Sequence, residues 1–373
     1  MKFNRYALSD LATIKYGKNQ KKVLSESGNI PIYGTGGLMG YATTALYDKP
    51  SVLIGRKGTI GKVKYVEHPF WTVDTLFYTI VNTDIVLPKY LYYVMSLIDL
   101  NNYNEGTTIP SLRTETLNRL EFDIPSLVEQ ETILSCLNPI DEKIALNNAI
   151  NNNLEQQAMA LFKSWFIDFE PFDRQVPKTW VNGVLGDFVE IKRGGSPRPI
   201  QNFLSDSGFH WLKISDATGI SSPFINEIKE YIIEAGSKKT VYLKSGSLVL
   251  SNSATPGLPK ILDIDTCIHD GWLYFPSSKF SNEYLYLYFK HIRDNLIALG
   301  NGSVFTNLKT DILKNYPTYL PTEDVLKKFD ELVQPIFSMI LSKTREIKRL
   351  AEIRDTLLPK LMSGELDVCD IEL

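Results

Sequence analysis

The pattern of hydrophobic and polar positions divides the chain into segments of two kinds, which occur twice in the same order. Short runs of β-branched and aromatic residues, separated by Gly, Asn, Asp and Pro, predict strands and loops. SVLIGRKG from residue 51, FWTVDTLFYTIV from residue 70 and SLVLSNSATPG from residue 247 are of this kind. A short helical stretch follows at 91–97 and again at 286–292, and beyond Pro125 and Pro321 a long apolar stripe at helical spacing begins. The pattern predicts an α+β protein.

The two stripes predict helices of about 40 residues, or roughly 55–60 Å. Apolar residues recur at alternating spacings of four and three, as in the seam of a coiled coil, with a phase slip expected near Ile336 to Ile340. Because a domain of about 125 residues cannot cover such a helix, we expect the two helices to pack on each other, antiparallel, between two globular domains. The predicted seam residues are Ile133, Leu137, Ile144, Leu154, Leu161, Phe329, Ile336, Ile347, Leu350 and Leu357.

Polar residues interrupt this seam at two places. Asn147 and Asn151 either fix the register of the helices, as seam asparagines do in other coiled coils, or lie in a frayed, exposed turn. Pro139 and Pro335, at equivalent sites, predict the same kink in both helices.

The chain is an internal duplication. An offset of 196 positions aligns residues that include Ser51 with Ser247, Gly61 with Gly257, Lys64 with Lys260, Asp74 with Asp270, Leu112 with Leu308 and Pro125 with Pro321. Upstream the offset is 177 and aligns Leu8 with Leu185, Asp10 with Asp187 and Gly17 with Gly194. The second copy therefore carries 19 extra residues, since Ser247 follows Lys192 by 55 positions and Ser51 follows Lys15 by 36. Duplication predicts two domains of one fold with pseudo-twofold symmetry.

The composition mainly excludes other classes of protein. The 373 residues are 43% hydrophobic and 22% charged, which is typical of a soluble globular protein, and the net charge of −3 gives no global attraction to nucleic acid or membrane. Three widely spaced cysteines and four histidines form no metal-ligand pattern, so no metal site is predicted. No signal peptide or run of 18 apolar residues is present, and we expect a cytoplasmic protein.

Motifs for catalysis and cofactor binding fail at specific positions. In GRKGTIGKV, Arg56 and Val63 stand where a phosphate-binding loop needs Gly and Ser or Thr, and in GTGGLMG, Met39 replaces the last glycine of a dinucleotide-binding loop. The Asn/Asp-Pro-Pro-aromatic tetrapeptide of amino-methyltransferases is also absent. We therefore predict no catalytic residue and no cofactor bound by this chain, which argues against a methyltransferase or nuclease in its own right.

Local charge instead indicates a polyanion. Basic residues gather without acidic neighbours in equivalent loops of both copies, beside Ser, Thr and Asn side chains, and together these are the groups that contact phosphates and base edges. Aligned side chains differ, Arg56 with Asn252 and Ser111 with Asn307, as expected either for two domains that read different sequences or for drifting surface loops. The predicted DNA contacts are Lys15, Lys18, Arg56, Lys57, Thr59, Lys62, Lys64, Thr107, Thr108, Ser111 and Arg113 in the first copy, and Lys192, Arg193, Arg198, Asn252, Ser253, Thr255, Lys260, Ser303, Asn307 and Lys309 in the second.

Five segments, in order, resemble the DNA-specificity subunits of type I restriction-modification enzymes. They are LSDLATIKYGK, VLIGRKGTIGKV, IPSLVEQETI from residue 124, LFKSWFIDFEPF from residue 161 and IRDTLLPKLMSGEL from residue 353. The resemblance covers essentially the whole length. It implies target-recognition domains at 1–126 and 171–321, spacer helices at 127–170 and 322–366, and an antiparallel coiled coil that separates the domains.

The resemblance also implies a function. Each domain would read one half of a split, asymmetric DNA target through the major groove, and the helices would set the gap and dock two modification subunits. Those subunits bind S-adenosylmethionine and methylate adenine, and restriction subunits join them for cleavage that uses ATP and Mg²⁺. One departure is TEDVLKKF from residue 322, where the first copy has SLVEQETI, so the second docking site is expected to differ in detail. A duplicated coiled-coil scaffold that binds protein or another polyanion stays the alternative.

Overall fold

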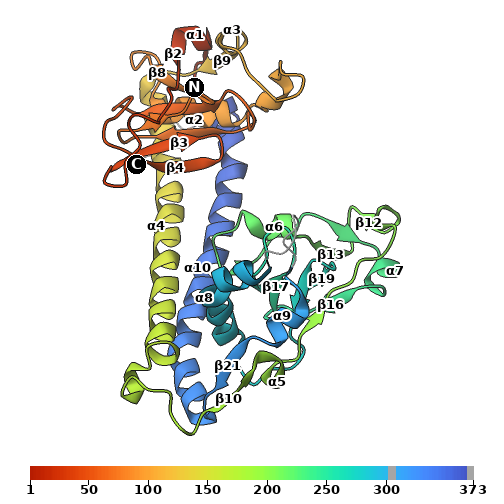
Figure 1. The fold of residues 1–373 in the computed structure, drawn as a ribbon. Helices are drawn as coiled ribbons and strands as arrows, with labels where there is room; N and C mark the ends of the chain where they lie inside the picture. The colour runs from red at the N-terminus through yellow and green to blue at the C-terminus, as the bar shows by residue number, and fades with distance from the viewer. Residues whose placement is uncertain (301–307, 368–373) are drawn as a thin grey trace. The chain divides into compact units, whose positions relative to one another are not determined.

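The computed structural model describes residues 1–300 and 308–367, and the chain forms two compact units. The first unit consists of Met1–Glu142 and the C-terminal residues from Leu350, and the second of Lys143–Arg349. Each unit therefore contains one repeat lobe and a part of each of two long helices (Figure 1). None of the described helices is long and apolar enough to cross a membrane.

The first lobe is built from three small sheets. A four-stranded antiparallel sheet has the order β2-β8-β5-β6, a three-stranded sheet has the order β4-β3-β7, and β1 pairs with β9. The elements are β1 (Asn4–Ala7), α1 (Leu8–Leu11), β2 (Ala12–Tyr16), β3 (Ile30–Gly34), β4 (Gly37–Ala42), β5 (Ser51–Gly55), β6 (Val63–Val66), β7 (Trp71–Thr72), β8 (Leu76–Val81), α2 (Pro88–Ser96), η1 (Leu100–Tyr103), α3 (Thr114–Asn118) and β9 (Glu121–Ile124).

The second lobe repeats this plan and enlarges it. Strands in the order β11-β20-β17-β18 reproduce β2-β8-β5-β6, and the pair β10-β21 reproduces β1-β9, so the predicted duplication is confirmed. The larger second copy adds β14 to this sheet and forms a second five-stranded sheet, β12-β15-β13-β19-β16. The elements are η2 (Glu170–Phe172), β10 (Val181–Val184), α5 (Leu185–Phe188), β11 (Lys192–Arg193), η3 (Ile200–Asn202), β12 (Leu204–Ser205), β13 (Phe209–Leu212), α6 (Ile214–Thr218), β14 (Phe224–Ile225), β15 (Tyr231–Ile232), α7 (Glu234–Ser237), β16 (Val241–Leu243), β17 (Leu248–Ser251), β18 (Pro259–Leu262), β19 (Thr266–Ile268), β20 (Trp272–Tyr274), α8 (Asn282–Gly300), α9 (Thr310–Lys314) and β21 (Pro317–Leu320).

The two long helices have the predicted lengths. Helix α4 (Leu127–Phe166) has 40 residues and α10 (Glu323–Ser363) has 41, each about 60 Å at 1.5 Å per residue. A capping box starts α4, since the Ser126 N–H donates to Glu129 Oε2 at 2.9 Å and the Glu129 N–H donates back to Ser126 Oγ at 3.4 Å. The N–H and the hydroxyl of Ser126 both donate to the Glu129 carboxylate and hold its pKa below its usual value. Both helices continue without interruption through Pro139 and Pro335, and the kink expected there stays a prediction.

The helices pack antiparallel within each unit, as the pattern predicts. In the second unit, ion pair Lys143–Glu346 (3.7 Å) and hydrogen bond Asn151–Thr344 (3.3 Å) are followed along α4 by the ring contact Phe162–Phe329. As the residue number rises along α4, the number of the contacting residue on α10 falls, so the two helices run antiparallel in this unit. In the first unit Arg354 pairs with Asp141 at 3.2 Å. The helices join the lobe cores there, because Ile133 and Leu137 are fully buried in one cluster with Leu358, Leu361 and Met362.

The predicted seam is buried or half-buried throughout. Ile133, Leu137 and Phe329 are fully buried, while Ile144, Leu154, Leu161, Ile336, Ile347, Leu350 and Leu357 are half-buried. One position of the apolar stripe was wrong. The spacing of four and three also predicts Leu332, three residues after Phe329, in the stripe of the second helix, but Leu332 is 46% exposed and the neighbouring Val333 is fully buried instead.

The seam asparagines are ordered and buried, and α10 departs from strict heptads. Asn147 is fully enclosed and Asn151 is 7% exposed, so the frayed turn is excluded. The fully buried positions from Phe329 to Thr344 follow a spacing of 4-4-3-4, which agrees with the predicted phase slip. Thr344 is one of these positions, and the sequence gives no apolar signal for it.

Candidate nucleic-acid interface

In the first unit, two predicted contact loops form one continuous surface. We call residues 56–62 and 104–113 the first loop pair. The Gly58 N–H donates to the Pro110 carbonyl at 2.8 Å, and the Leu112 N–H donates to the Arg56 carbonyl at 2.9 Å. Lys57 and Ser111 form an isolated antiparallel β-bridge. Segments about 50 residues apart in the sequence thus present Arg56, Lys57, Thr59 and Lys62 beside Thr107, Thr108, Ser111 and Arg113.

Arg56 is held in place by its surroundings. Its guanidinium lies over the ring of Tyr16, 5.1 Å from the centroid, and Nη1 donates to the carbonyl of Asp74 at 2.8 Å. One donor and one face of the planar group are used by these contacts. The remaining donors of this half-buried side chain are free to recognise a phosphate or a guanine edge.

The other basic residues of this lobe have accessible side chains. Lys15, Lys18, Lys57, Lys62, Lys64 and Arg113 are all exposed. The Lys64 ammonium lies 3.8 Å above the ring of Tyr33, and Arg113 pairs with Glu105 at 3.1 Å. Lys18 follows β2, and its N–H donates to the carbonyl of Thr72 at 2.8 Å. Thr72 stands two residues before Asp74, whose carbonyl binds Arg56. Among the basic residues predicted as contacts in the first lobe, all except the half-buried Arg56 are therefore exposed.

The loop carrying Thr107 and Thr108 is braced by the side chain of Asn104. Asn104 Oδ1 accepts the N–H groups of Gly106 and Ser111, both at 2.9 Å. Only glycine fits at position 106, because a Cβ there would lie 1.9 Å from the carbonyl oxygen of Ile109. Ile109 itself is 58% exposed at the tip. Its apolar side chain gives no signal of DNA contact in the sequence, although such a side chain is suited to contact a thymine methyl group.

The second unit uses the same two hydrogen bonds to build its counterpart. The Leu308 N–H donates to the carbonyl of Asn252 at 2.7 Å, as Leu112 does to Arg56. Asn252 Nδ2 donates to the carbonyl of Asp270 at 3.2 Å, as Arg56 does to Asp74. The scaffold is therefore common to both repeats, while the side chain at this position changes from Arg to Asn.

Asp270 organises the basic residues of the second lobe. Its carbonyl accepts from Arg193 Nε at 2.5 Å, and its carboxylate accepts from Ser196 Oγ at 2.8 Å and pairs with Arg198 at 3.3 Å. Arg198 remains 79% exposed, so it can exchange this partner for a phosphate. The sequence held a signal for this role, because aspartate occupies the position in both repeats.

Other predicted residues of the second lobe differ in accessibility. Lys192 is exposed and pairs with Glu190 at 2.8 Å, and Lys309 is exposed at the start of α9. Ser253 and Thr255 are half-buried. Ser303 and Asn307 lie outside the described residues.

Two predicted DNA contacts are corrected by burial. Asn252 is 4% exposed, and its amide is directed to Asp270, so it supports the loop and does not face a bound duplex. Lys260 is 2% exposed, and its ammonium donates to the carbonyls of Ile220 (2.6 Å) and Ser222 (2.5 Å). Burial lowers the pKa of Lys260 to about 8. The segment that encloses Lys260 belongs to the larger second copy, whereas Lys64 at the aligned position is exposed.

No group of three or more His, Cys, Asp or Glu residues able to hold a metal ion occurs among residues 1–300 and 308–367. In that part of the chain the interface instead consists of basic and hydroxyl side chains on ordered loops. Such a surface can bind a polyanion without a resident ion.

Comparisons with known proteins identify the family of the chain. The family model for the type I restriction modification DNA specificity domain matches residues 2–156 and 177–350, one match for each repeat. The type I restriction enzyme MjaIX specificity subunit of Methanocaldococcus jannaschii is 29% identical over 87% of this chain and 79% of its own length. The HindI specificity subunit of Haemophilus influenzae is 26% identical over 82% of this chain and 84% of its own length.

Solved structures show the same fold. The crystal structure of the type I restriction-modification S subunit from M. genitalium superposes with a TM-score of 0.61, at 16% identity, over 97% of this chain and 96% of the other. With the family model covering both repeats, the chain belongs to the DNA-specificity family of type I restriction-modification systems, as a specificity subunit that has no catalytic role of its own.

Proposed function

We propose that this chain recognises a bipartite, asymmetric duplex DNA target, with one half-site read by each repeat. The observation that carries the proposal is the loop scaffold that both lobes share. The same two hydrogen bonds assemble it, but Arg56 lies at the surface of one and Asn252 is enclosed in the other. Equal scaffolds with unequal side chains support the same docking mode on unequal base sequences.

The basic residues would provide affinity and the hydroxyl and loop-tip residues discrimination. Lys15, Lys18, Lys57 and Lys62 in the first lobe have the chemistry for phosphate contacts, which position a protein on DNA and make binding steeply salt-dependent. Arg56 and the Thr107–Ile109 tip have the chemistry for base edges and thymine methyl groups. In the second lobe Arg193, Arg198, Ser253, Thr255 and Lys309 would contribute, without the enclosed Asn252 and Lys260.

The long helices would set the distance between half-sites and dock the partner subunits. The proposed partners are two modification subunits, which use S-adenosylmethionine, and restriction subunits, which use ATP and Mg²⁺. At the start of α4 the fully buried Gln130 ties the helix to its own lobe, since its side chain accepts from the Leu87 N–H at 2.8 Å and donates to Ile85 and Pro125. Leu326 takes this position in the second repeat, so the starts of the two helices are held differently, and we propose that the docking sites there differ in detail. Work on DNA with these partners would place the chain in the cytoplasm.

Selection from a random duplex library tests the proposal. The chain is co-purified with its modification subunit, and bound duplexes are sequenced after several rounds at about 0.15 M salt. We expect one enriched motif with two unlike halves and a fixed gap. Salt-sensitive binding without an enriched motif would favour the alternative, a scaffold that binds polyanions without base specificity.

A further inference from the structure

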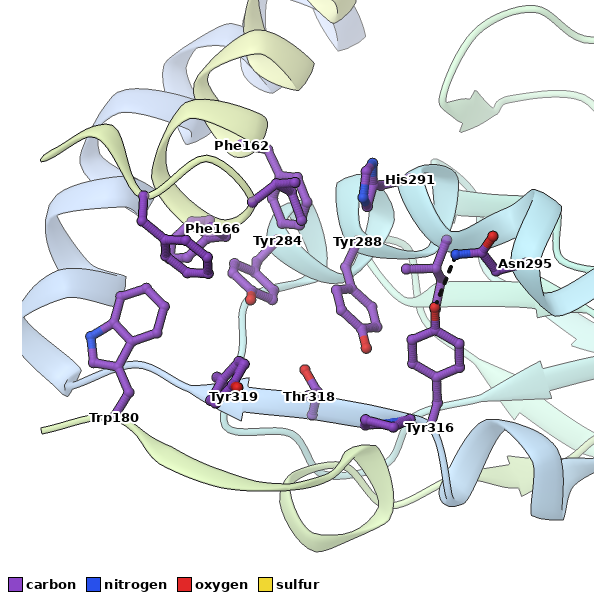
Figure 2. Close-up of a pocket in the computed structure, with 14 residues that line it drawn as sticks. Phe162, Phe166, Trp180, Tyr284, Tyr288, His291, Asn295, Tyr316, Thr318 and Tyr319 are labelled. Carbon is purple, nitrogen blue, oxygen red and sulfur yellow. Dashed lines mark hydrogen bonds between the residues drawn. The ribbon is translucent and has the colours of Figure 1, made fainter. Parts of the chain in front are cut away.

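The second unit contains an aromatic cavity of about 260 Å³ next to the C-terminal end of α4 (Figure 2). Its walls are formed mainly by rings and include Phe162, Phe166, Trp180, Tyr284, Tyr288 and Tyr316. Thr318 on β21 faces this space, with its hydroxyl directed toward the rings of α8 (Figure 2). None of the described residues that line the cavity is Asp, Glu, Lys or Arg.

The buried polar group at the centre of this cavity is the hydroxyl of Tyr288, in a side chain that is 7% exposed. It lies next to Thr318: burial raises the pKa of Tyr288, and the contact with the Thr318 side chain lowers it in part. The indole N–H of Trp180 is also enclosed, but it points away from the other lining residues (Figure 2). A ligand with one hydroxyl would extend the contact between Tyr288 and Thr318, because each hydroxyl can both donate and accept a hydrogen bond.

The first repeat shows what fills the corresponding place. The offset of 196 positions aligns Thr318 with Phe122, which is 4% exposed in the core of the first lobe. Phe162 and Phe166 align with Leu358 and Met362 of that core, so larger side chains from the helix recover part of the space. These side chains do not fill the space completely. A cavity remains beside Thr318, which stands where the first repeat has the ring of Phe122.

We propose that this cavity is a binding site for one planar aromatic group that carries a single hydroxyl, that is, a phenol. The space exceeds that of an apolar cavity of about 150 Å³ known to take benzene, and the walls offer ring faces and edges for stacking. The hydroxyl would pair with Tyr288 or Thr318. Charged ligands are disfavoured because the walls hold no charge to compensate theirs. A free phenol and a tyrosine side chain of a partner protein share this chemistry.

Titration of the purified full-length chain with p-cresol, the side-chain analogue of tyrosine, tests the site. The indole NMR signal of Trp180, assigned with Trp180→Phe, reports on the cavity wall. We expect a saturable shift for the wild-type chain and for Thr318→Val, which keeps the cavity, but none for Thr318→Phe, which restores the ring of the first repeat. Tyr288→Phe should weaken the binding of p-cresol about tenfold and leave the binding of toluene unchanged. This variant provides the test if Thr318→Phe does not fold.

Two results would overturn the proposal. The first is the absence of a saturable shift with p-cresol in the wild-type chain, and the second is equal binding to Thr318→Phe. The affinity of the chain for its modification subunit distinguishes the two sources of the phenol group, a partner tyrosine and a free phenol. A tenfold loss in Thr318→Phe identifies a partner tyrosine, and an unchanged affinity identifies a free phenol. Because these measurements need no DNA, their failure is distinguishable from a failure of the proposed recognition function.

Discussion

Replacement of Lys260 by methionine should change how the stability of the second lobe depends on pH. Methionine is similar in length and removes the charge, but it leaves the carbonyls of Ile220 and Ser222 without their side-chain donor. Burial lowers the pKa of this lysine from 10.5 to about 8 in the folded state. Between these values the unfolded chain binds the proton and the folded chain has released it, so the free energy of unfolding rises with pH.

The magnitude follows from the size of the shift. Each pH unit in that window contributes up to about 1.4 kcal/mol, and because the folded lysine is only half deprotonated at pH 8, the wild-type chain should gain about 1.6 kcal/mol relative to Lys260→Met between pH 8 and 9.5. Well below pH 8 both states are protonated, and the difference should be constant. Cys267 acts in the opposite direction, since burial raises its pKa to about 11, but it is common to both proteins and cancels in the difference.

Urea denaturation at several pH values from 7 to 9.5, followed by tryptophan fluorescence, measures this difference. A wild-type-minus-variant difference that stays flat across the range would refute the burial argument. DNA binding provides the second readout. Lys260→Met should keep the wild-type slope of log affinity against log salt, whereas Lys309→Ala, an exposed control, should reduce it by about one.

Three further outcomes follow from the geometry. Arg56→Ala should lower discrimination in only one selected half-site, by about 1–3 kcal/mol for a bidentate guanine contact, and a uniform loss over all sequences would make Arg56 a phosphate contact instead. Removing one matched heptad from both long helices, residues 142–148 and 347–353, shortens the pair by about 10 Å and should change the selected gap but neither half-site; footprints with the original gap would contradict the spacer role. Phe329→Ala should lower the free energy of unfolding in urea titrations by about 3–5 kcal/mol. The ring is fully buried, with its centroid 4.8 Å from that of Phe166 and 5.9 Å from that of Trp165, and a loss below about 1 kcal/mol would contradict that packing.

The sequence by itself determined the features that repeat or have a period. The offset of 196 positions established two copies of one fold, and the apolar spacing established two helices of about 40 residues with a shared seam. These survive without tertiary information because each depends on many positions, so that a single error, such as Leu332 in place of Val333, does not change the conclusion. The loops of the first lobe were also found from charge alone.

Only the tertiary structure decided what individual side chains face. Lys64 and Lys260 are aligned, yet the first is exposed and the second donates to Ile220 and Ser222, because the segment over it exists only in the larger copy. The aromatic cavity likewise depends on which large side chains fail to refill the place of Phe122. Accessibility and unfilled volume are sums over neighbours brought together by the fold, and a pattern along the chain does not contain those neighbours.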